Sequence, residues 1–329
     1  MVSPEIRYVV VLATFNGARY VDALLESISV QDPRPEKIFV RDDGSEDHTI
    51  AEVTASATAL GLKTEWLPTD GRKGVCGSFS KLLEKASDYP YVFLADQDDL
   101  WEPDKAASML TAMRAAEDAS AHDFPVLVHS DLNVIDDKGG VIAKSFFEYQ
   151  GLGFSGGDFS SLLLQNNVTG CACLLNACLV RRCMPIPAEA VMHDWWIGLV
   201  ASAFGRKVFL ASPYTRYRQH DRNVIGAHRW GLRYIIQRGR EILSADGARR
   251  AVHPVVRQAR AFHERFGGEL PMELQSQLLA VMTLGSKRRW LRLGGLCRVI
   301  GGKQGVLRKC GFAFATMRSA ALLEGPSRD

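Results

Sequence analysis

The sequence contains no CxxC pair, and its seven cysteines form an odd set, so neither a complete disulfide framework nor a structural zinc site is expected. No apolar run approaches the roughly 18 residues needed to cross a bilayer. The first residues lack the charged, apolar and small-residue order of a signal peptide. These absences favour a cytoplasmic protein with reduced cysteines.

Gly-rich phosphate motifs are also missing. Neither GxGxxG nor GxxxxGK(S/T) follows any predicted strand, which argues against a Rossmann dinucleotide site and against a P-loop. No internal repeat of fixed period is present. A nucleotide bound by this chain must therefore be held by other means.

Acidic residues are absent from one long stretch. From Leu274 to Leu323 there are nine Lys or Arg residues and no Asp or Glu, whereas residues 1–273 carry a net charge of −5 within a total of +3. Trp290, Leu293, Cys297 and Ile300 fall on one helical stripe in this basic region. The stripe fits contact with an anionic membrane surface, such as the cytoplasmic face of an inner membrane, and equally fits packing on a catalytic domain. No nucleic-acid-binding module accompanies it, so nucleic acid is not expected as a partner.

The first half of the chain alternates between strand-like and helix-like segments. This order predicts an α/β fold with a mostly parallel sheet and helices on its faces. The expected strands are 7–14, 36–43, 64–68, 91–96 and 125–136, and the expected helices are 19–31, 46–60, 77–88 and 102–118. After a Gly-rich loop at 147–159 we expect strands at 166–176 and 207–220 with a helix at 193–205 between them. From about residue 226 the chain is predicted to be helical and basic, which gives domains 1–225 and 226–329.

The segment YVFLADQDDLW places three carboxylates at the end of a buried strand. One or two aspartates at such a place can cap the next helix, but three would repel one another unless a cation lies between them. Mg²⁺ and Mn²⁺ prefer carboxylate and phosphate oxygens. Asp96, Asp98 and Asp99 are therefore predicted to form a metal–diphosphate site.

Two further polar motifs follow predicted strands. One is ATFN (Ala13 to Asn16), and the other is RDDGSEDHT, in which Asp43 can accept from a nucleobase N–H. The second motif is also ordinary turn chemistry, with Ser45 or Asp47 as a helix cap. In parallel sheets, ligands bind beyond the carboxyl ends of the strands, where both motifs are expected.

Two segments of the second half carry further candidates. Asp194 in MHDWWIG is either a helix cap or a general base, and the adjacent His193 is expected to be structural. In YTRYRQHDRN, Arg216, Arg218 and Arg222 surround His220. Clustered arginines suit a diphosphate leaving group, and a neutral imidazole can complete a metal shell.

Taken in order, these motifs resemble family-2 inverting glycosyltransferases of the GT-A fold, a Rossmann-like architecture, over roughly two-thirds of the chain, from Tyr8 to Gly226. LADQDDLW is similar to the DXD element, and HDWW to the catalytic-base segment. YRQHDRNVIG and DQDDLW are similar to segments of bacterial rhamnosyltransferase-like members. The resemblance implies Mn²⁺ or Mg²⁺, a dTDP- or UDP-sugar donor, plausibly dTDP-L-rhamnose, and a polysaccharide or lipid-linked saccharide acceptor, as in cell-wall or O-antigen synthesis.

The same resemblance assigns roles to individual residues. Donor contacts are assigned to Ala13, Thr14, Asn16, Asp43, Asp96 and Arg218. Asp98, Asp99 and His220 are the expected metal ligands, although the sequence leaves open which aspartate of the cluster touches the metal. Asp194 would deprotonate the acceptor hydroxyl.

Two other functions are compatible with parts of the sequence. A sugar nucleotidyltransferase needs a Gly-rich, basic loop after its first strand, and ATFNGARY offers a single glycine. A catalytically silent sugar-nucleotide or glycan-binding protein fits the same motifs without Asp194. Processive relatives carry QxxRW and membrane spans; here SKRRW (Ser286 to Trp290) has Ser in place of Gln, so a non-processive enzyme is expected.

Overall fold

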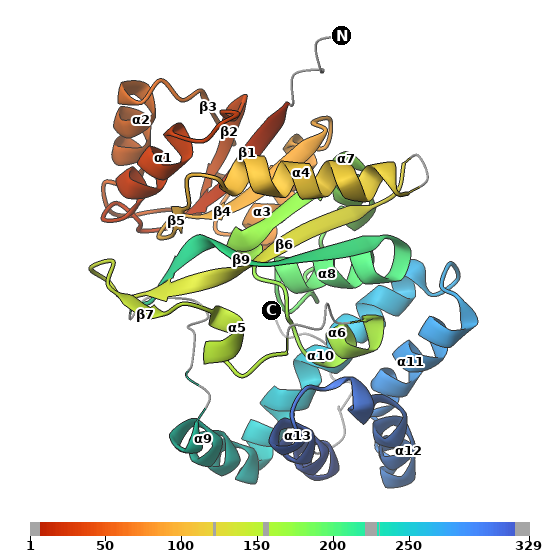
Figure 1. Ribbon diagram of the computed structural model, residues 1–329. Coiled ribbons are helices and arrows are strands. Elements are labelled where there is room, and N and C mark those ends of the chain that lie inside the picture. Colours follow the sequence, from red (N-terminus) through yellow and green to blue (C-terminus); the bar gives the residue numbers. More distant parts are fainter. Residues whose placement is uncertain (1–6, 121–122, 154–157, 221–228, 230, 320–329) are drawn as a thin grey trace. The chain divides into compact units, whose positions relative to one another are not determined.

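A computed structural model describes residues 7–120, 123–153, 158–220, 229 and 231–319 of the chain (Figure 1). None of the helices within these ranges is both long and apolar enough to span a bilayer. The chain forms two compact units. The first contains Met1–Tyr149, Val168–Ala188 and Met192–Ala227, and the second contains Gln150–Asn167, Glu189–Val191 and His228–Asp329.

The first unit is an α/β domain. Its strands are β1 (Tyr8–Thr14), β2 (Lys37–Asp42), β3 (Thr64–Trp66), β4 (Tyr91–Asp96), β5 (Leu100–Trp101), β6 (Val126–Ile135), β7 (Val141–Ala143), β8 (Cys173–Asn176) and β9 (Arg206–Arg218). Its helices are α1 (Val21–Ser29), α2 (Thr49–Ala59), α3 (Gly74–Lys85), α4 (Lys105–Asp118), α5 (Phe146–Tyr149), the 3₁₀ turn η1 (Gly170–Ala172), α7 (Ala177–Cys183) and α8 (His193–Phe204). The expected alternation of strands and helices is confirmed.

One sheet of nine strands joins the described part of this unit, in the order β3-β2-β1-β4-β8-β6-β9-β5, with β7 beside β6. The run β3-β2-β1-β4 is parallel, as the sequence predicts, and β6 pairs with β9 in parallel. Antiparallel pairing enters where β8 lies between β4 and β6. The carboxyl ends of β1, β2 and β4 therefore share one edge.

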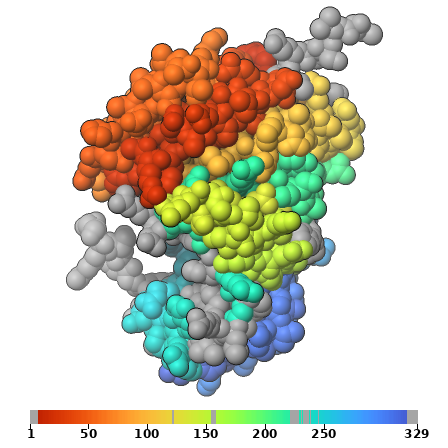
Figure 2. All heavy atoms as spheres, turned by 60° about the vertical axis from the view of Figure 1, so that its left-hand side comes forward, coloured from red at the N-terminus to blue at the C-terminus, as the bar shows by residue number. Residues whose placement is uncertain are grey.

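Both faces of the sheet are covered because its strands are apolar on both sides. Tyr8, Val10 and Leu12 of β1 pack in one core with apolar side chains of α1, α2 and α4, while α3, α7 and α8 contact the opposite face (Figure 1). Helix α1 shows the expected pattern, since Val21, Leu24, Leu25 and Ile28 recur at helical spacing and are buried. The segments from β1 to α3, coloured red to orange, form one continuous surface in Figure 2.

The second unit is helical within the described residues, as predicted for the C-terminal region. It consists of α6 (Phe159–Leu164), α9 (Leu232–Leu243), α10 (Ala245–Phe266), α11 (Met272–Thr283), α12 (Arg289–Val299), the 3₁₀ turn η2 (Ile300–Gly302) and α13 (Val306–Arg318). The ring of Phe262 packs against Phe159 and Phe266, with centroids 5.5 and 5.0 Å apart. The unit begins earlier than the expected boundary at 225 because it takes up α6.

Helix α12 turns its predicted apolar stripe outward. Trp290 and Leu293 are exposed, whereas Leu296 and Val299 are buried. A Cβ atom at Gly295 would lie 2.1 Å from Oγ1 of Thr283, so the glycine permits close approach to α11. That close approach fixes which face of α12 is buried.

Candidate active site

Polar strand ends meet at one edge of the sheet. The register pairs Thr14 of β1 with Asp42 of β2, and Ala13 of β1 with Asp96 of β4. Because these strands are parallel, the residues that follow them emerge on the same side. The three polar motifs singled out in the sequence are thus neighbours in space.

Asp42 builds the turn after β2. Its carboxylate accepts hydrogen bonds from Oγ1 of Thr14 at 2.8 Å, from Oγ of Ser45 at 2.6 Å, and from the backbone N–H groups of Gly44 and Ser45 at 3.0 and 2.7 Å. Gly44 has a φ of +91°, a conformation that strains other residues. The hydroxyl of Thr14, which is predicted to contact the sugar-nucleotide donor, is thus hydrogen-bonded to this turn.

Asn16 and Gln97 tie the neighbouring turns together. The Asn16 N–H donates to Oγ of Ser45, and Oδ1 of Asn16 accepts from the N–H of Glu46, both at 2.8 Å. The Gln97 amide exchanges two 2.9 Å hydrogen bonds with the backbone of Phe15. These bonds hold the ends of β1, β2 and β4 in one arrangement. Donor contact by Asn16 itself stays a prediction.

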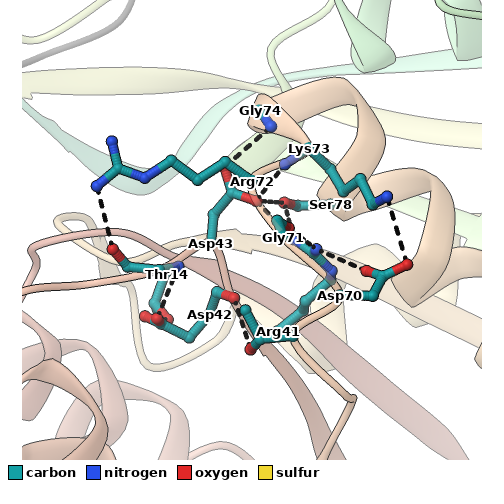
Figure 3. A network of polar contacts seen from close by, with 12 residues as sticks. Thr14, Arg41, Asp42, Asp43, Asp70, Gly71, Arg72, Lys73, Gly74 and Ser78 are labelled. Atoms are coloured by element: carbon teal, nitrogen blue, oxygen red, sulfur yellow. Dashed lines mark hydrogen bonds and ion pairs between the residues drawn. The ribbon is translucent and has the colours of Figure 1, made fainter.

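Arg41, the first residue of the motif RDDGSEDHT, is fully buried (Figure 3). Its Nη1 atom donates to Oδ1 of Asp43 and to Oγ of Ser78, both at 2.7 Å, and Nη2 donates to the carbonyl of Gly71 at 2.9 Å and to Asp70 at 3.2 Å. The motif itself assigns no role to Arg41. The only signal was a charged residue near the end of an otherwise apolar strand.

Asp43, the predicted base-contacting residue, is held by this network and by the chain after β3. Its two oxygens accept from the N–H groups of Lys73 and Gly74, at 2.7 and 2.9 Å (Figure 3). Desolvation raises the pKa of Asp43, but the hydrogen bonds from Lys73, Arg41 and Gly74 outweigh it and leave the pKa below its ordinary value. Asp43 is therefore an ionised and fixed carboxylate.

Asp98 and His220 come together from distant parts of the chain. Nε2 of His220 lies 2.7 Å from Oδ2 of Asp98. The imidazole stacks on the ring of Tyr20, with centroids 4.9 Å apart and planes 14° apart. The Tyr20 hydroxyl in turn donates to Asp137. Two residues expected to bind metal are thus adjacent, and one is oriented by an aromatic ring.

Asp99 points into the protein and is fully buried. Its Oδ1 atom accepts from the Arg218 N–H at 2.9 Å, and Oδ2 has no hydrogen-bond partner within the described residues. Ligand atoms of Asp96, Asp99 and Cys171 lie within 4.8 Å of one another. Burial raises the pKa of the Cys171 thiol well above its ordinary value, with the charges of Asp99 and Asp96 adding to the effect. The thiol is therefore protonated and can donate to a carboxylate.

The acid cluster is electrostatically strained. Desolvation, followed by the negative charges of Asp98 and Asp194, raises the pKa of Asp96 to about 7. Desolvation and the charges of Asp98 and Asp96 also raise the pKa of Asp99 well above its ordinary value. Burial and mutual repulsion thus both disfavour the fully ionised form of the cluster.

A compensating positive charge comes from Lys105, which the sequence analysis missed. Its buried ammonium donates to the Cys171 carbonyl at 2.6 Å and to Oγ1 of Thr215 at 3.0 Å, and it lies 4.0 Å from the ring centroid of Trp101. Burial lowers the pKa of Lys105 to about 8, although nearby Asp99 and Asp96 oppose the shift. Lys105 therefore stabilises the ionised forms of both carboxylates.

The carboxylates of the acid cluster and the imidazole of His220 fit a divalent cation. Asp98 and His220 offer oxygen and imidazole ligands side by side. A cation beside the cluster would offset the repulsion between carboxylates that contributes to the raised pKa of Asp96. Carboxylate oxygens with one imidazole suit Mn²⁺ and Mg²⁺ better than soft metals.

The arginines near His220 are engaged with the protein. Nε of Arg218 donates to the Asp98 carbonyl at 2.9 Å, and Nη1 donates to the Asp137 carbonyl at 3.0 Å. Arg216 pairs with Glu102 through two bonds of 2.8 and 3.1 Å. Arg222 lies outside the described residues. Arg218 thus links the turn after β4 to the turn after β6, and its contact with a donor stays a prediction.

Asp194 begins α8 and is nearly buried. Its carboxylate accepts from the Gly170 N–H at 3.0 Å and from the Trp195 N–H at 2.6 Å. Its charge contributes to the raised pKa of Asp96, so the two carboxylates are near neighbours. The neighbouring His193 is buried and stacks on Phe79 with centroids 3.9 Å apart, which agrees with a structural role.

The architecture defined by this sheet and its polar edge is the GT-A fold of glycosyltransferases. S. aureus TarS 1-349, solved in complex with UDP-GlcNAc, superimposes with a TM-score of 0.52 at 16% identity over 95% of this chain and 89% of its own. Mannosyltransferase PcManGT from Pyrobaculum calidifontis, solved in complex with GDP-Man and Mn²⁺, also gives 0.52 at 16% identity, over 95% and 84% of the two chains.

Sequence comparison gives the family. Residues 9–156 match the model of glycosyl transferase family 2. A dTDP-rhamnosyl transferase, RfbG of Shigella flexneri, is 24% identical over 232 residues, which cover 66% of this chain and 74% of that protein. Both comparisons agree with the resemblance to family-2 glycosyltransferases that the motifs of the sequence indicate.

Proposed function

We propose that the protein is a non-processive, inverting and metal-dependent glycosyltransferase. It transfers one sugar, or a few, from a nucleoside-diphosphate sugar to a hydroxyl of a bacterial polysaccharide or lipid-linked saccharide. The observation that carries the proposal is the Asp98–His220 pair, which lies at the same sheet edge as the fixed Asp43 carboxylate, with Asp194 near the Asp96 end of the cluster.

In this mechanism Asp43 accepts a hydrogen bond from the nucleobase, and Asp96 binds the ribose. Asp98 and His220 would hold Mn²⁺ or Mg²⁺, with Asp99 behind them, and the bound ion supplies charge that stabilises the leaving diphosphate. Asp194 takes the proton from the acceptor hydroxyl. The acceptor oxygen then bonds to the anomeric carbon as the bond from that carbon to the diphosphate oxygen breaks on the opposite side, which inverts the anomeric configuration.

We propose dTDP-L-rhamnose as the leading donor. The support is the likeness to RfbG, whose name specifies dTDP-rhamnosyl transfer, together with the YRQHDRNVIG segment. The superimposable solved structures contain UDP-GlcNAc or GDP-Man, so the nucleotide must be tested directly.

The first experiment is a calorimetric titration of the full chain with dTDP and UDP, each with Mn²⁺ and with EDTA. Metal-dependent binding that favours dTDP is the expected result. A preference for UDP would retain the transferase and reject rhamnose as the leading sugar. Absence of binding to either nucleotide by folded protein with Mn²⁺ would reject the donor site.

Catalysis is tested with Asp194→Asn. Loss of a general base lowers turnover by about 10²- to 10⁴-fold, while binding of the nucleotide should remain. Asp88→Asn, which changes an exposed carboxylate elsewhere in the same unit, is the matched control. Full activity of Asp194→Asn would reject the role of Asp194 as the general base. If the wild-type chain binds the nucleotide but transfers no sugar, a catalytically silent nucleotide-sugar-binding protein is favoured instead.

A further inference from the structure

The last two helices of the second unit present large apolar side chains to solvent. On α12, Trp290 and Leu293 are 64% and 46% exposed; on α13, Val306, Leu307 and Phe314 are 76%, 55% and 45% exposed. Residues of these types are usually buried, and an exposed group of them marks a surface that contacts something else. We refer to these five side chains as the apolar stripes.

Cations accompany the stripes, and acids do not. Of the nine Lys and Arg residues between 274 and 323, Arg292, Lys303 and Arg308 donate to backbone carbonyls inside the second unit. The other six lie wholly or partly at the surface: Lys287, Arg288, Arg289, Arg298, Lys309 and Arg318. No Asp or Glu lies in this stretch, so α12 and α13 themselves carry only positive charge.

We propose that α12 and α13 dock onto the surface of an anionic lipid bilayer. Basic residues are attracted to the negative surface potential of such membranes. Aliphatic and aromatic side chains beside them enter the boundary between headgroups and acyl chains, where Trp is especially favourable because its ring is amphipathic. The cations thus match the anionic headgroups of the bilayer, and the apolar stripes match the boundary between headgroups and acyl chains.

Other occupants fit this surface less well. A second copy that docked through the same surface would place six cations against six, with no acid in the segment to pair with them, and like charges in contact repel. A nucleic acid would satisfy the cations but would gain nothing from the exposed aliphatic side chains of Leu293, Val306 and Leu307. Of these three occupants, the bilayer matches both the apolar side chains and the cations.

The proposal deepens the proposed function, because docking would bring the enzyme to lipid-linked acceptors, but its test does not depend on sugar transfer. The full chain is sedimented with vesicles of phosphatidylcholine alone and with vesicles that also contain phosphatidylglycerol, at low and high salt. Binding to the anionic vesicles that weakens at high salt is expected, since surface charge is screened.

Two variants separate the apolar and electrostatic contributions. Trp290→Ser/Leu293→Ser removes the α12 stripe, and Lys287→Gln/Arg288→Gln/Arg289→Gln removes three cations; each should weaken binding by about tenfold or more. Val30→Ser/Ile50→Ser and Lys63→Gln/Lys81→Gln/Lys144→Gln make the same kinds of change at exposed positions of the first unit and should bind like wild type. Circular dichroism confirms that each variant is folded.

Three results would overturn the proposal. One is failure of the folded wild-type chain to bind anionic vesicles, and another is equal binding to neutral vesicles. The third is self-association in the absence of lipid that Trp290→Ser/Leu293→Ser abolishes, because that result would assign the stripe to a second copy of the chain. None of these results changes the nucleotide titration, so failure here and failure of the proposed function are distinguishable.

Discussion

Nε2 of His220 lies 2.7 Å from Oδ2 of Asp98, although the two residues are 122 positions apart in the sequence. His220 follows β9, whereas Asp98 follows β4. The imidazole also stacks on the ring of Tyr20. This pair gives the most direct tests of the candidate site.

Removing either member of the pair should weaken metal binding. We expect Asp98→Asn and His220→Ala each to lower Mn²⁺ affinity by about 100-fold, because loss of a ligand should cost at least as much as loss of a supporting residue, which costs about 10- to 100-fold. Titration of Mn²⁺ followed by electron paramagnetic resonance measures this without any turnover. His48→Ala, an exposed histidine in the same unit, should behave like wild type. Wild-type affinity in both site variants would place the metal elsewhere.

Tyr20 should act as a positioning residue through its ring. Tyr20→Leu removes the surface on which His220 stacks and should lower Mn²⁺ affinity by about tenfold. Tyr20→Phe keeps the ring while losing the hydroxyl bond to Asp137, so its affinity should stay near that of wild type. The same resonance titration compares the two. An equal loss of Mn²⁺ affinity in both variants would show that the hydroxyl bond to Asp137 matters and that the ring stacking does not.

Arg41 should be important for stability as well as for the nucleotide site. Arg41→Met leaves Asp43 and Ser78 without their buried partner, and breaking a buried ion pair costs about 3–5 kcal/mol. Urea unfolding measures the loss. The exposed pair of Arg72 with Glu46 provides the control, since Arg72→Met should change the free energy of unfolding by less than about 1 kcal/mol. A similar small change in Arg41→Met would contradict the prediction.

His129 should make the fold sensitive to acid. Burial, with a smaller contribution from the charge of Lys207, lowers the pKa of His129 to about 3, and burial does the same for His193. Between pH of about 6.5 and 3, the unfolded chain therefore binds more protons than the folded chain. The free energy of unfolding is unaffected by these groups above this window, and within it decreases by about 1.4 kcal/mol for each group as the pH is lowered by one unit.

The variant His129→Leu should reduce this slope, because it removes one of the two titrating rings. Urea unfolding at a series of pH values measures the slope. The exposed His48 supplies the comparison, and His48→Leu should retain the wild-type slope. An unchanged slope in His129→Leu would show that His129 is protonated in the folded chain.

Local pattern predicted much of this structure. Apolar runs bounded by polar residues identified the parallel strands, and the strand ends then predicted that Thr14, Asp42 and Asp96 would be neighbours, which the register confirms. The distant meeting of Asp98 with His220 agrees with the family resemblance. It could not follow from spacing alone, because it depends on the parallel pairing of β6 with the long strand β9.

Burial of charged residues was not predictable in the same way. Arg41 and Lys105 carry ordinary charged side chains in the sequence, and only tertiary packing places them behind the carboxylates. Arg218 was expected at the diphosphate, yet its guanidinium binds backbone carbonyls of two turns. On α12, the periodic pattern identified a stripe but could not tell that Gly295 would turn the opposite face toward α11.

The chain passes between its two units more than once, since Gln150–Asn167 belongs to the second, helical unit although segments of the first unit precede and follow it. Arg308 of α13 donates to the Gly151 carbonyl at 2.6 Å, and Gln304 accepts from the Gly153 N–H at 2.7 Å. The two units are therefore not separable modules. A chain cut after β9 would keep the buried Phe159 but lose Phe262, against which its ring packs, so such a truncation would expose apolar surface of the helical unit.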